Sequence, residues 1–247
     1  MKRPIFEELD FQATPLGDLV LRRRSLPDLD GIIVHEIILG DAYLMTSLFT
    51  EVESALSRLG IAATEAAFPG EKLNVVVGGL GLGYTAKVAL DHPSIGSLRV
   101  VDYLAPVIDW HRRGLVPLGP ELSEDPRCRF VHGDFFKLAA ADTTSFEPES
   151  CTERHHAILL DIDHSPSNLL HQRHEEFYSP AGLRRLAEKI HPGGIFALWS
   201  DDPPEETFMQ ALAEVFDTCE SHIVSFDNPH LGGKSESTVY VARRSKA

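Results

Sequence analysis

The stretch that decides the fold is LNVVVGGLGLGYTAK, residues 73–87. It begins as an apolar strand, passes through Gly79, Gly81 and Gly83, and continues with helical spacing to about Leu90. Glycines at a strand-to-helix turn let a ligand approach the backbone and aim helix N–H groups at it. Tyr84 stands where a dinucleotide fingerprint has its last glycine, so the run predicts a mononucleoside turn. Tight packing of the helix on the strand is the alternative explanation.

Further apolar runs follow the turn and are separated by segments with helical spacing. Runs rich in valine, isoleucine and leucine that alternate with helices are typical of a parallel sheet buried on both faces. The segment between the last two runs is too short for a crossover helix, which predicts an antiparallel hairpin. The expected fold is therefore α/β, with seven strands at residues 73–77, 98–101, 128–132, 156–160, 195–199, 222–226 and 238–242.

The N-terminal part has a different pattern. Residues 10–39 alternate short β-like runs with proline, glycine and aspartate turn residues, which predicts a small antiparallel β unit. Leucines and a valine at helical spacing predict a helix over residues 41–60, with Asp41 as the N-cap and Gly60 as the stop. The expected division is a small β unit at 1–40 and a Rossmann-like nucleoside-binding domain at 41–247.

Acidic residues follow the second and third strands of the main sheet. Asp102, in RVVDYLAP, is placed to accept hydrogen bonds from a ribose diol, with Tyr103 beside it. Asp134, in RFVHGDFF, is placed to accept from an adenine amino group, with Phe135 beside the ring. Each aspartate alone is equally well explained as a helix cap. Together with the glycine turn they predict an adenosine-type ligand at the carboxyl edge of the sheet.

This constellation resembles the class I S-adenosylmethionine-dependent methyltransferases, whose sheet also ends in an antiparallel hairpin. From about residue 10 to 215 it is more similar to the spermidine synthase family. That family has an N-terminal β domain, a G-G-G-D-G-G turn, an acidic residue after the second strand, G-D after the third and D-x-x-D-P after the fourth. The corresponding pieces here are GGLGLG (78–83), Asp102, Gly133-Asp134, DIDHSP (161–166) and FYSPAGLRRLAEKIHPGG (177–194).

The chain departs from the family pattern at two places. Gly81 replaces the aspartate that, by the resemblance, holds the amino end of decarboxylated S-adenosylmethionine. A glycine also removes a repulsion against the carboxylate of ordinary S-adenosylmethionine. In DIDHSP the proline falls one place late and His164 stands where the second acid is expected. The resemblance therefore implies a changed donor or acceptor.

Two aspartates end the fourth strand. On an extended chain Asp161 and Asp163 point the same way, and two carboxylates beside one crevice raise each other's pKa and bind a cation. Transfer from a sulfonium to an amine requires a neutral, aligned nucleophile. We therefore expect Asp161 to orient the amine and accept its proton, and Asp163 to assist it by binding substrate. Capping of the next helix is the alternative for each.

Three further residues are expected to contact the acceptor: Tyr43, His164 and Asp201. Trp199 either walls the acceptor pocket or packs in the core. His171 and His174 are spaced as a metal-ligand pair, but no third ligand is evident and the segment corresponds to the family's gating loop. We therefore expect no metal.

Composition limits the possible partners. The chain has 247 residues, and 23 basic against 37 acidic side chains give a net charge of −14, which opposes nucleic-acid binding. The three cysteines, an odd number far apart, and the lack of a long apolar segment predict a cytoplasmic protein with no membrane partner. The family resemblance implies a homodimer.

The leading functional expectation is an enzyme that uses S-adenosylmethionine to methylate a small amine, because Gly81 favours the carboxylated donor. Spermidine synthase-type aminopropyl transfer from decarboxylated S-adenosylmethionine to a diamine such as putrescine is the first alternative. A non-catalytic nucleoside-binding protein is the second.

Overall fold

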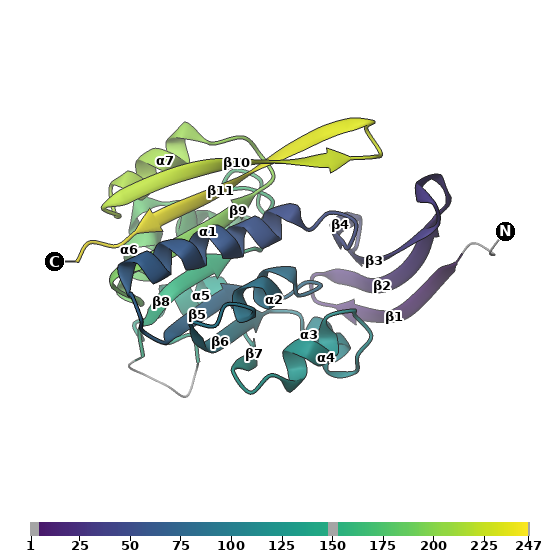
Figure 1. Cartoon of the computed structure of the whole chain (residues 1–247), viewed down its shortest axis with the longest axis horizontal. Coiled ribbons are helices and arrows are strands. Elements are labelled where there is room, and N and C mark those ends of the chain that lie inside the picture. The colour runs from purple at the N-terminus through teal and green to yellow at the C-terminus, as the bar shows by residue number, and fades with distance from the viewer. Residues whose placement is uncertain (1–4, 148–152, 247) are drawn as a thin grey trace.

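The computed structural model describes residues 5–147 and 153–246, so Cys151 lies outside it. Two sheets are joined by a long helix (Figure 1). The N-terminal sheet is antiparallel in the order β1-β2-β3-β4. Its strands are β1 (Phe6–Thr14), β2 (Gly17–Leu26), β3 (Ile32–Leu39) and β4 (Ala42–Thr46), with the short helix η1 (Pro27–Leu29) after β2.

The main sheet has the order β10-β11-β9-β8-β5-β6-β7. The pairs from β9 through β8, β5 and β6 to β7 are parallel, and β11 is antiparallel to both β9 and β10. All seven predicted strands are therefore confirmed, including the terminal hairpin. They are β5 (Leu73–Gly78), β6 (Ile95–Asp102), β7 (Cys128–His132), β8 (His155–Leu160), β9 (Ile190–Ser200), β10 (Thr218–Asn228) and β11 (Gly233–Arg243).

Helices cover both faces of the main sheet. The helices are α1 (Glu51–Ala67), α2 (Tyr84–Leu90), α3 (Ala105–Arg112), α4 (Gly119–Glu124), α5 (Phe135–Ala140), η2 (Gln172–Tyr178), α6 (Pro180–Glu188) and α7 (Glu206–Ala213). Successive residues of β5 separate two cores: Val75 and Val77 pack with Leu56 of α1, whereas Val76 packs with Leu183 of α6. This alternation on fully apolar strands is what a sheet buried on both faces requires.

The helix predicted over residues 41–60 is wrong at both ends. Residues 42–46 form β4 and pair with β3, and α1 begins only at Glu51. The helix then continues through Gly60, which packs against β8: a Cβ at Gly60 would lie 2.5 Å from Leu159 Cδ2. Gly60 is therefore a close-approach residue and does not end the helix. The division of the chain at residue 40 stays a prediction.

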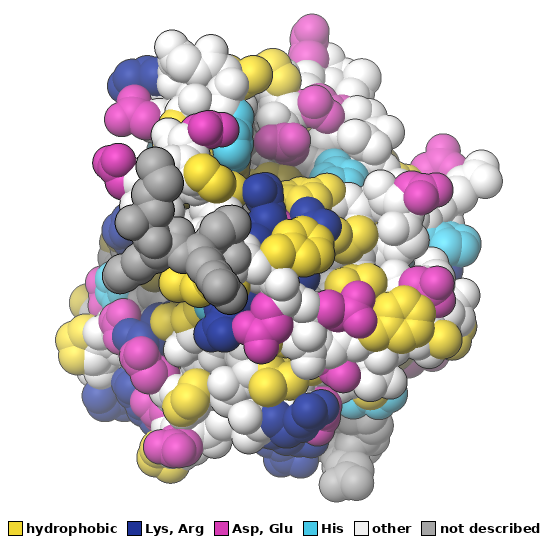
Figure 2. Space-filling view, turned by 90° about the vertical axis from the view of Figure 1, so that its right-hand side faces the viewer, with side chains coloured by type: hydrophobic (Ala, Val, Ile, Leu, Met, Phe, Trp, Pro, Cys, Tyr) yellow, Lys and Arg dark blue, Asp and Glu magenta, His cyan; other side chains and the backbone are white. Residues whose placement is uncertain are grey.

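The surface on the side of the N-terminal sheet is mixed in charge. Figure 2 shows acidic side chains spread across this face, with basic side chains in smaller groups among them. None of the helices in the described ranges is both long and apolar enough to span a bilayer.

Candidate functional site

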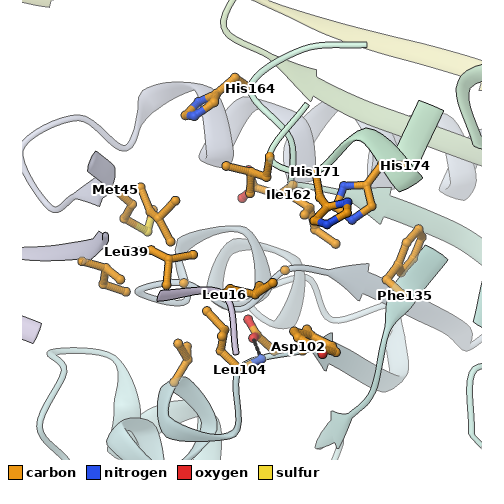
Figure 3. Close-up of a pocket in the computed structure, with 18 of the residues that line it drawn as sticks. Leu16, Leu39, Met45, Asp102, Leu104, Phe135, Ile162, His164, His171 and His174 are labelled. Atoms are coloured by element: carbon orange, nitrogen blue, oxygen red, sulfur yellow. Dashed lines mark hydrogen bonds between the residues drawn. The ribbon is translucent and has the colours of Figure 1, made fainter. Parts of the chain in front are cut away.

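The glycine turn lies against the end of β8. Gly79, Gly81 and Gly83 have φ angles of +93°, +47° and +93°, a region that residues with a Cβ rarely adopt. A Cβ at Gly79 would lie 2.0 Å from the backbone oxygen of Asp161. Gly79 and Gly81 line a cavity of about 360 Å³ that lies between the N-terminal sheet and the carboxyl ends of β5 to β8 (Figure 3). This is the crevice that the sequence predicted.

Asp102 both faces this cavity and fixes the glycine turn. Its two carboxylate oxygens accept hydrogen bonds from the backbone N–H groups of Leu80, at 2.9 Å, and Leu104, at 2.7 Å. Burial raises the pKa of Asp102, and these N–H groups offset part of that effect. Tyr103, the next residue, also lines the cavity. A ribose diol would therefore meet an acceptor that the turn itself holds in place.

Asp134 caps a helix with one carboxylate oxygen, and its other oxygen accepts no hydrogen bond within the described residues. Its Oδ1 accepts from the backbone N–H of Lys137 at 3.2 Å, at the start of α5. Its Oδ2 is buried and accepts no hydrogen bond within the described residues, although it forms ion pairs with the Arg173 guanidinium at 3.6 Å and with Lys137 Nζ at 3.9 Å. Phe135 lines the cavity beside Asp134. The cap and the ligand interpretations are thus compatible, and a buried acceptor fits an adenine amino group.

Asp161 lies in the cavity at the end of β8. Its Oδ2 accepts a hydrogen bond of 2.6 Å from the Thr85 hydroxyl of α2. Burial raises the pKa of Asp161 to about 6. A half-buried carboxylate with a pKa near neutrality is suited to accept a proton from an amine.

Asp163 does not share the cavity with Asp161, so the expectation that the two side chains point the same way is wrong. The reason is that β8 ends at Leu160, and the period of two does not continue through residues 161–163. Asp163 is 1% exposed and accepts from the Leu170 backbone N–H at 2.8 Å and the Tyr178 hydroxyl at 2.9 Å. Nδ1 of His174 also lies 2.9 Å from its Oδ1. These partners show that Asp163 holds the segment 170–178 in place.

That segment forms one wall of the cavity. The ring of His174 stacks on Phe136 with centroids 3.8 Å apart, and the Arg173 guanidinium lies 5.2 Å from the centre of the Tyr103 ring. His171 lines the cavity from the same segment (Figure 3). No group of three or more metal-ligating side chains was found in the described residues. His171 and His174 both line the first cavity as parts of this wall.

A second cavity of about 410 Å³ adjoins the first and contains the predicted acceptor residues Tyr43, His164 and Asp201. Tyr43 comes from β4 instead of a helix, and its hydroxyl donates to Glu36 at 2.5 Å. Ser237 donates to Asp201 at 3.3 Å. The residues that line both cavities are Leu44, Met45, Glu53, His164 and Trp199.

Sequence reasoning missed Glu53 of α1. Its side chain is partly buried, and burial together with the nearby Asp161 raises its pKa to about 8. Met45 was missed as well, although its sulfur accepts the Leu82 backbone N–H at 3.0 Å. One acid on a predicted amphipathic helix looks like a solvated residue, so no sequence signal separated Glu53 from Glu51.

The chain is similar to known proteins in its fold more than in its sequence. No family model matches the sequence. In solved structures, a spermidine synthase in complex with the transition-state analogue AdoDATO superposes with a TM-score of 0.69 at 15% identity, covering 97% of this chain and 73% of that one. The spermidine synthase of Thermotoga maritima superposes with a TM-score of 0.68 at 16% identity, covering 97% of this chain and 74% of its own. The chain has the fold of the spermidine synthases.

Other relatives agree with this spermidine synthase-like fold. Human methyltransferase-like protein 13, solved with SAH, gives a TM-score of 0.58 at 16% identity over 78% of this chain and 82% of its own. A curated polyamine aminopropyltransferase of Korarchaeum cryptofilum is 26% identical over 153 residues, which is 61% of this chain. The match spans only 43% of that relative's length. The resemblance inferred from the motifs is thereby confirmed.

Proposed function

We propose that this spermidine synthase-like protein transfers an aminopropyl group from decarboxylated S-adenosylmethionine to a small amine. The observation that carries the proposal is Asp161, a carboxylate with a raised pKa in the first cavity, which adjoins a second cavity that contains Tyr43, His164 and Asp201. In the reaction, the amine nitrogen bonds to the propyl carbon, the carbon–sulfur bond breaks and 5′-methylthioadenosine leaves. Asp161 orients the amine and takes its proton.

The donor is assigned to the first cavity because hydrogen-bond-accepting side chains line that cavity. Asp102 faces the ribose, the unbonded Oδ2 of Asp134 faces the adenine amino group, and Phe135 and Tyr103 flank them. The acceptor is assigned to the second cavity, with Tyr43, His164 and Asp201 as its contacts. Asp163 supports the first cavity indirectly, because it holds the segment that walls the donor.

Aminopropyl transfer takes precedence here over methyl transfer, which Gly81 alone favours. The curated relative, named as a polyamine aminopropyltransferase, supports this order. Methyl transfer stays the second candidate, since Gly81 places no carboxylate against the methionine end of S-adenosylmethionine. A cytoplasmic location and a homodimer remain predictions.

Calorimetric titration with each donor tests the proposal. We expect the decarboxylated donor to bind, and Asp134→Ala to weaken it by about 10-fold, the scale of a lost hydrogen bond in a buried site. Preference for ordinary S-adenosylmethionine would favour methyl transfer. If neither donor binds, the nucleoside assignment is wrong.

A further inference from the structure

Glu53 occupies the junction of the two cavities. It lies in the first turn of α1, and it is one of the five side chains that line both cavities. The other four are Leu44, Met45, His164 and Trp199. A ligand that extends from the donor cavity toward the acceptor cavity therefore meets a boundary of which Glu53 is the only carboxylate among the described residues.

The charged groups that act on Glu53 are acidic. They are Asp161 at the end of β8, Asp201 after β9 and Glu51 on its own helix. The pKa of Tyr84 of α2 is raised by burial and also by the charge of Glu53. Like charges in a site of low polarity disfavour full ionisation, so the Glu53–Asp161 pair retains a proton near neutral pH. A cation placed between them would relieve the repulsion and displace that proton.

Met45 occupies the space that an acidic side chain at position 81 of the glycine turn would need in order to reach the junction of the two cavities. A Cβ at Gly81 would lie 2.7 Å from Met45 Sδ, and the same sulfur accepts the Leu82 N–H. The thioether of β4 therefore fills the space beside Gly81. Acidic charge at the junction is supplied from α1 instead of from the glycine turn.

We propose that Glu53 and Asp161 form a clamp for the cationic amino end of the donor, and that Glu53 is the residue that discriminates against a donor carrying a carboxylate. This inference rests on the proposed function and adds the residue that sets donor choice. An ammonium group between the two carboxylates gains charge-assisted hydrogen bonds, whereas a carboxylate attached to the same carbon would be brought against them.

The test is calorimetric titration of the wild-type protein, Glu53→Gln and the matched control Glu51→Gln with both donors. Glu51 is exposed and lies two residues away on the same helix. We expect Glu53→Gln to lose about 10-fold or more in affinity for the decarboxylated donor while affinity for S-adenosylmethionine stays level or rises. Glu51→Gln should keep the wild-type preference.

Proton release on donor binding is a second readout. Titrating the wild-type protein with the decarboxylated donor in buffers of different ionisation enthalpy at pH 7 counts the protons released. We expect net release that disappears in Glu53→Gln. A wild-type donor preference retained by Glu53→Gln, or no proton release, would overturn the clamp while leaving the proposed function standing. Failure of the wild-type protein to bind either donor would overturn both.

Discussion

At the scale of single residues, Asp161 is the side chain on which the proposed transfer depends most. Because its carboxyl group accepts the proton and is also half of the proposed clamp, Asp161→Asn should reduce kcat at saturating donor by at least about 100-fold and weaken binding of the decarboxylated donor by about 10-fold, as Glu53→Gln does. Steady-state kinetics together with calorimetry check this. Asp163→Asn is not an equivalent control, since Asp163 supports the wall segment 170–178. Turnover that survives in Asp161→Asn would remove this residue from the chemistry.

Asp102 supports a second prediction at this scale. Asp102→Ala deletes the acceptor for the ribose and also the two bonds that fix Leu80 and Leu104. We expect donor binding to weaken by about 1.5–3 kcal/mol, the range for hydrogen bonds to a charged group. Isothermal titration measures it. Unchanged affinity would place the ribose elsewhere.

At the scale of elements, β4 and the glycine turn are fitted to each other. Gly81→Asp forces a side chain into the space of Met45 Sδ at a residue with φ of +47°. We expect a loss of about 1–3 kcal/mol in the free energy of unfolding, as for overpacked or strained sites. The double variant Gly81→Asp with Met45→Ala should lose less than the sum of the two single changes. Denaturant unfolding of the four proteins measures the coupling, and additive losses would show that β4 and the turn are independent.

Some helices and strands were predictable from the sequence, and others were not. The seven main strands were predictable because each is an apolar run between turn residues, and parallel order follows from the intervening helices. The shared position of Asp102 and Asp134 on one cavity was predictable because strand ends meet at one edge, whereas their roles as ligand contacts stay predictions. The start of α1 was not predictable from the sequence. Leu44 and Leu48 fit helical spacing, but residues 42–46 form a strand that pairs with β3. The place of Glu53 in the site was not predictable either, because only the packing of α1 across the sheet brings it close to Asp161.

At the scale of the whole molecule, the acidic pair makes stability depend on pH. Burial raises the folded-state pKa of Asp161 to about 6 and that of Glu53 to about 8, above their ordinary values of 3.8 and 4.5. The folded protein therefore binds more protons than the unfolded chain in this window, so the pair costs stability as pH rises through it. Buried His111 and His155, whose pKa values burial lowers to about 4 and about 3, act in the opposite direction below about pH 6.5.

Comparison with Glu53→Gln isolates this effect. The free energy of unfolding of the wild-type protein should fall relative to that of Glu53→Gln as pH rises from about 5 to 8, because the variant lacks the group that must ionise. Urea unfolding at several pH values measures the difference. A difference that is constant with pH would show that Glu53 ionises in the folded protein as it does in water.

We propose that the protein transfers an aminopropyl group and not a methyl group. The most direct measurement is to incubate the enzyme with equal amounts of both donors and a set of diamines that includes putrescine, and to identify the products by mass spectrometry. We expect an aminopropylated amine and 5′-methylthioadenosine, both of which should be lost in Asp161→Asn. A methylated amine with S-adenosylhomocysteine, or the absence of both nucleoside products, would contradict it.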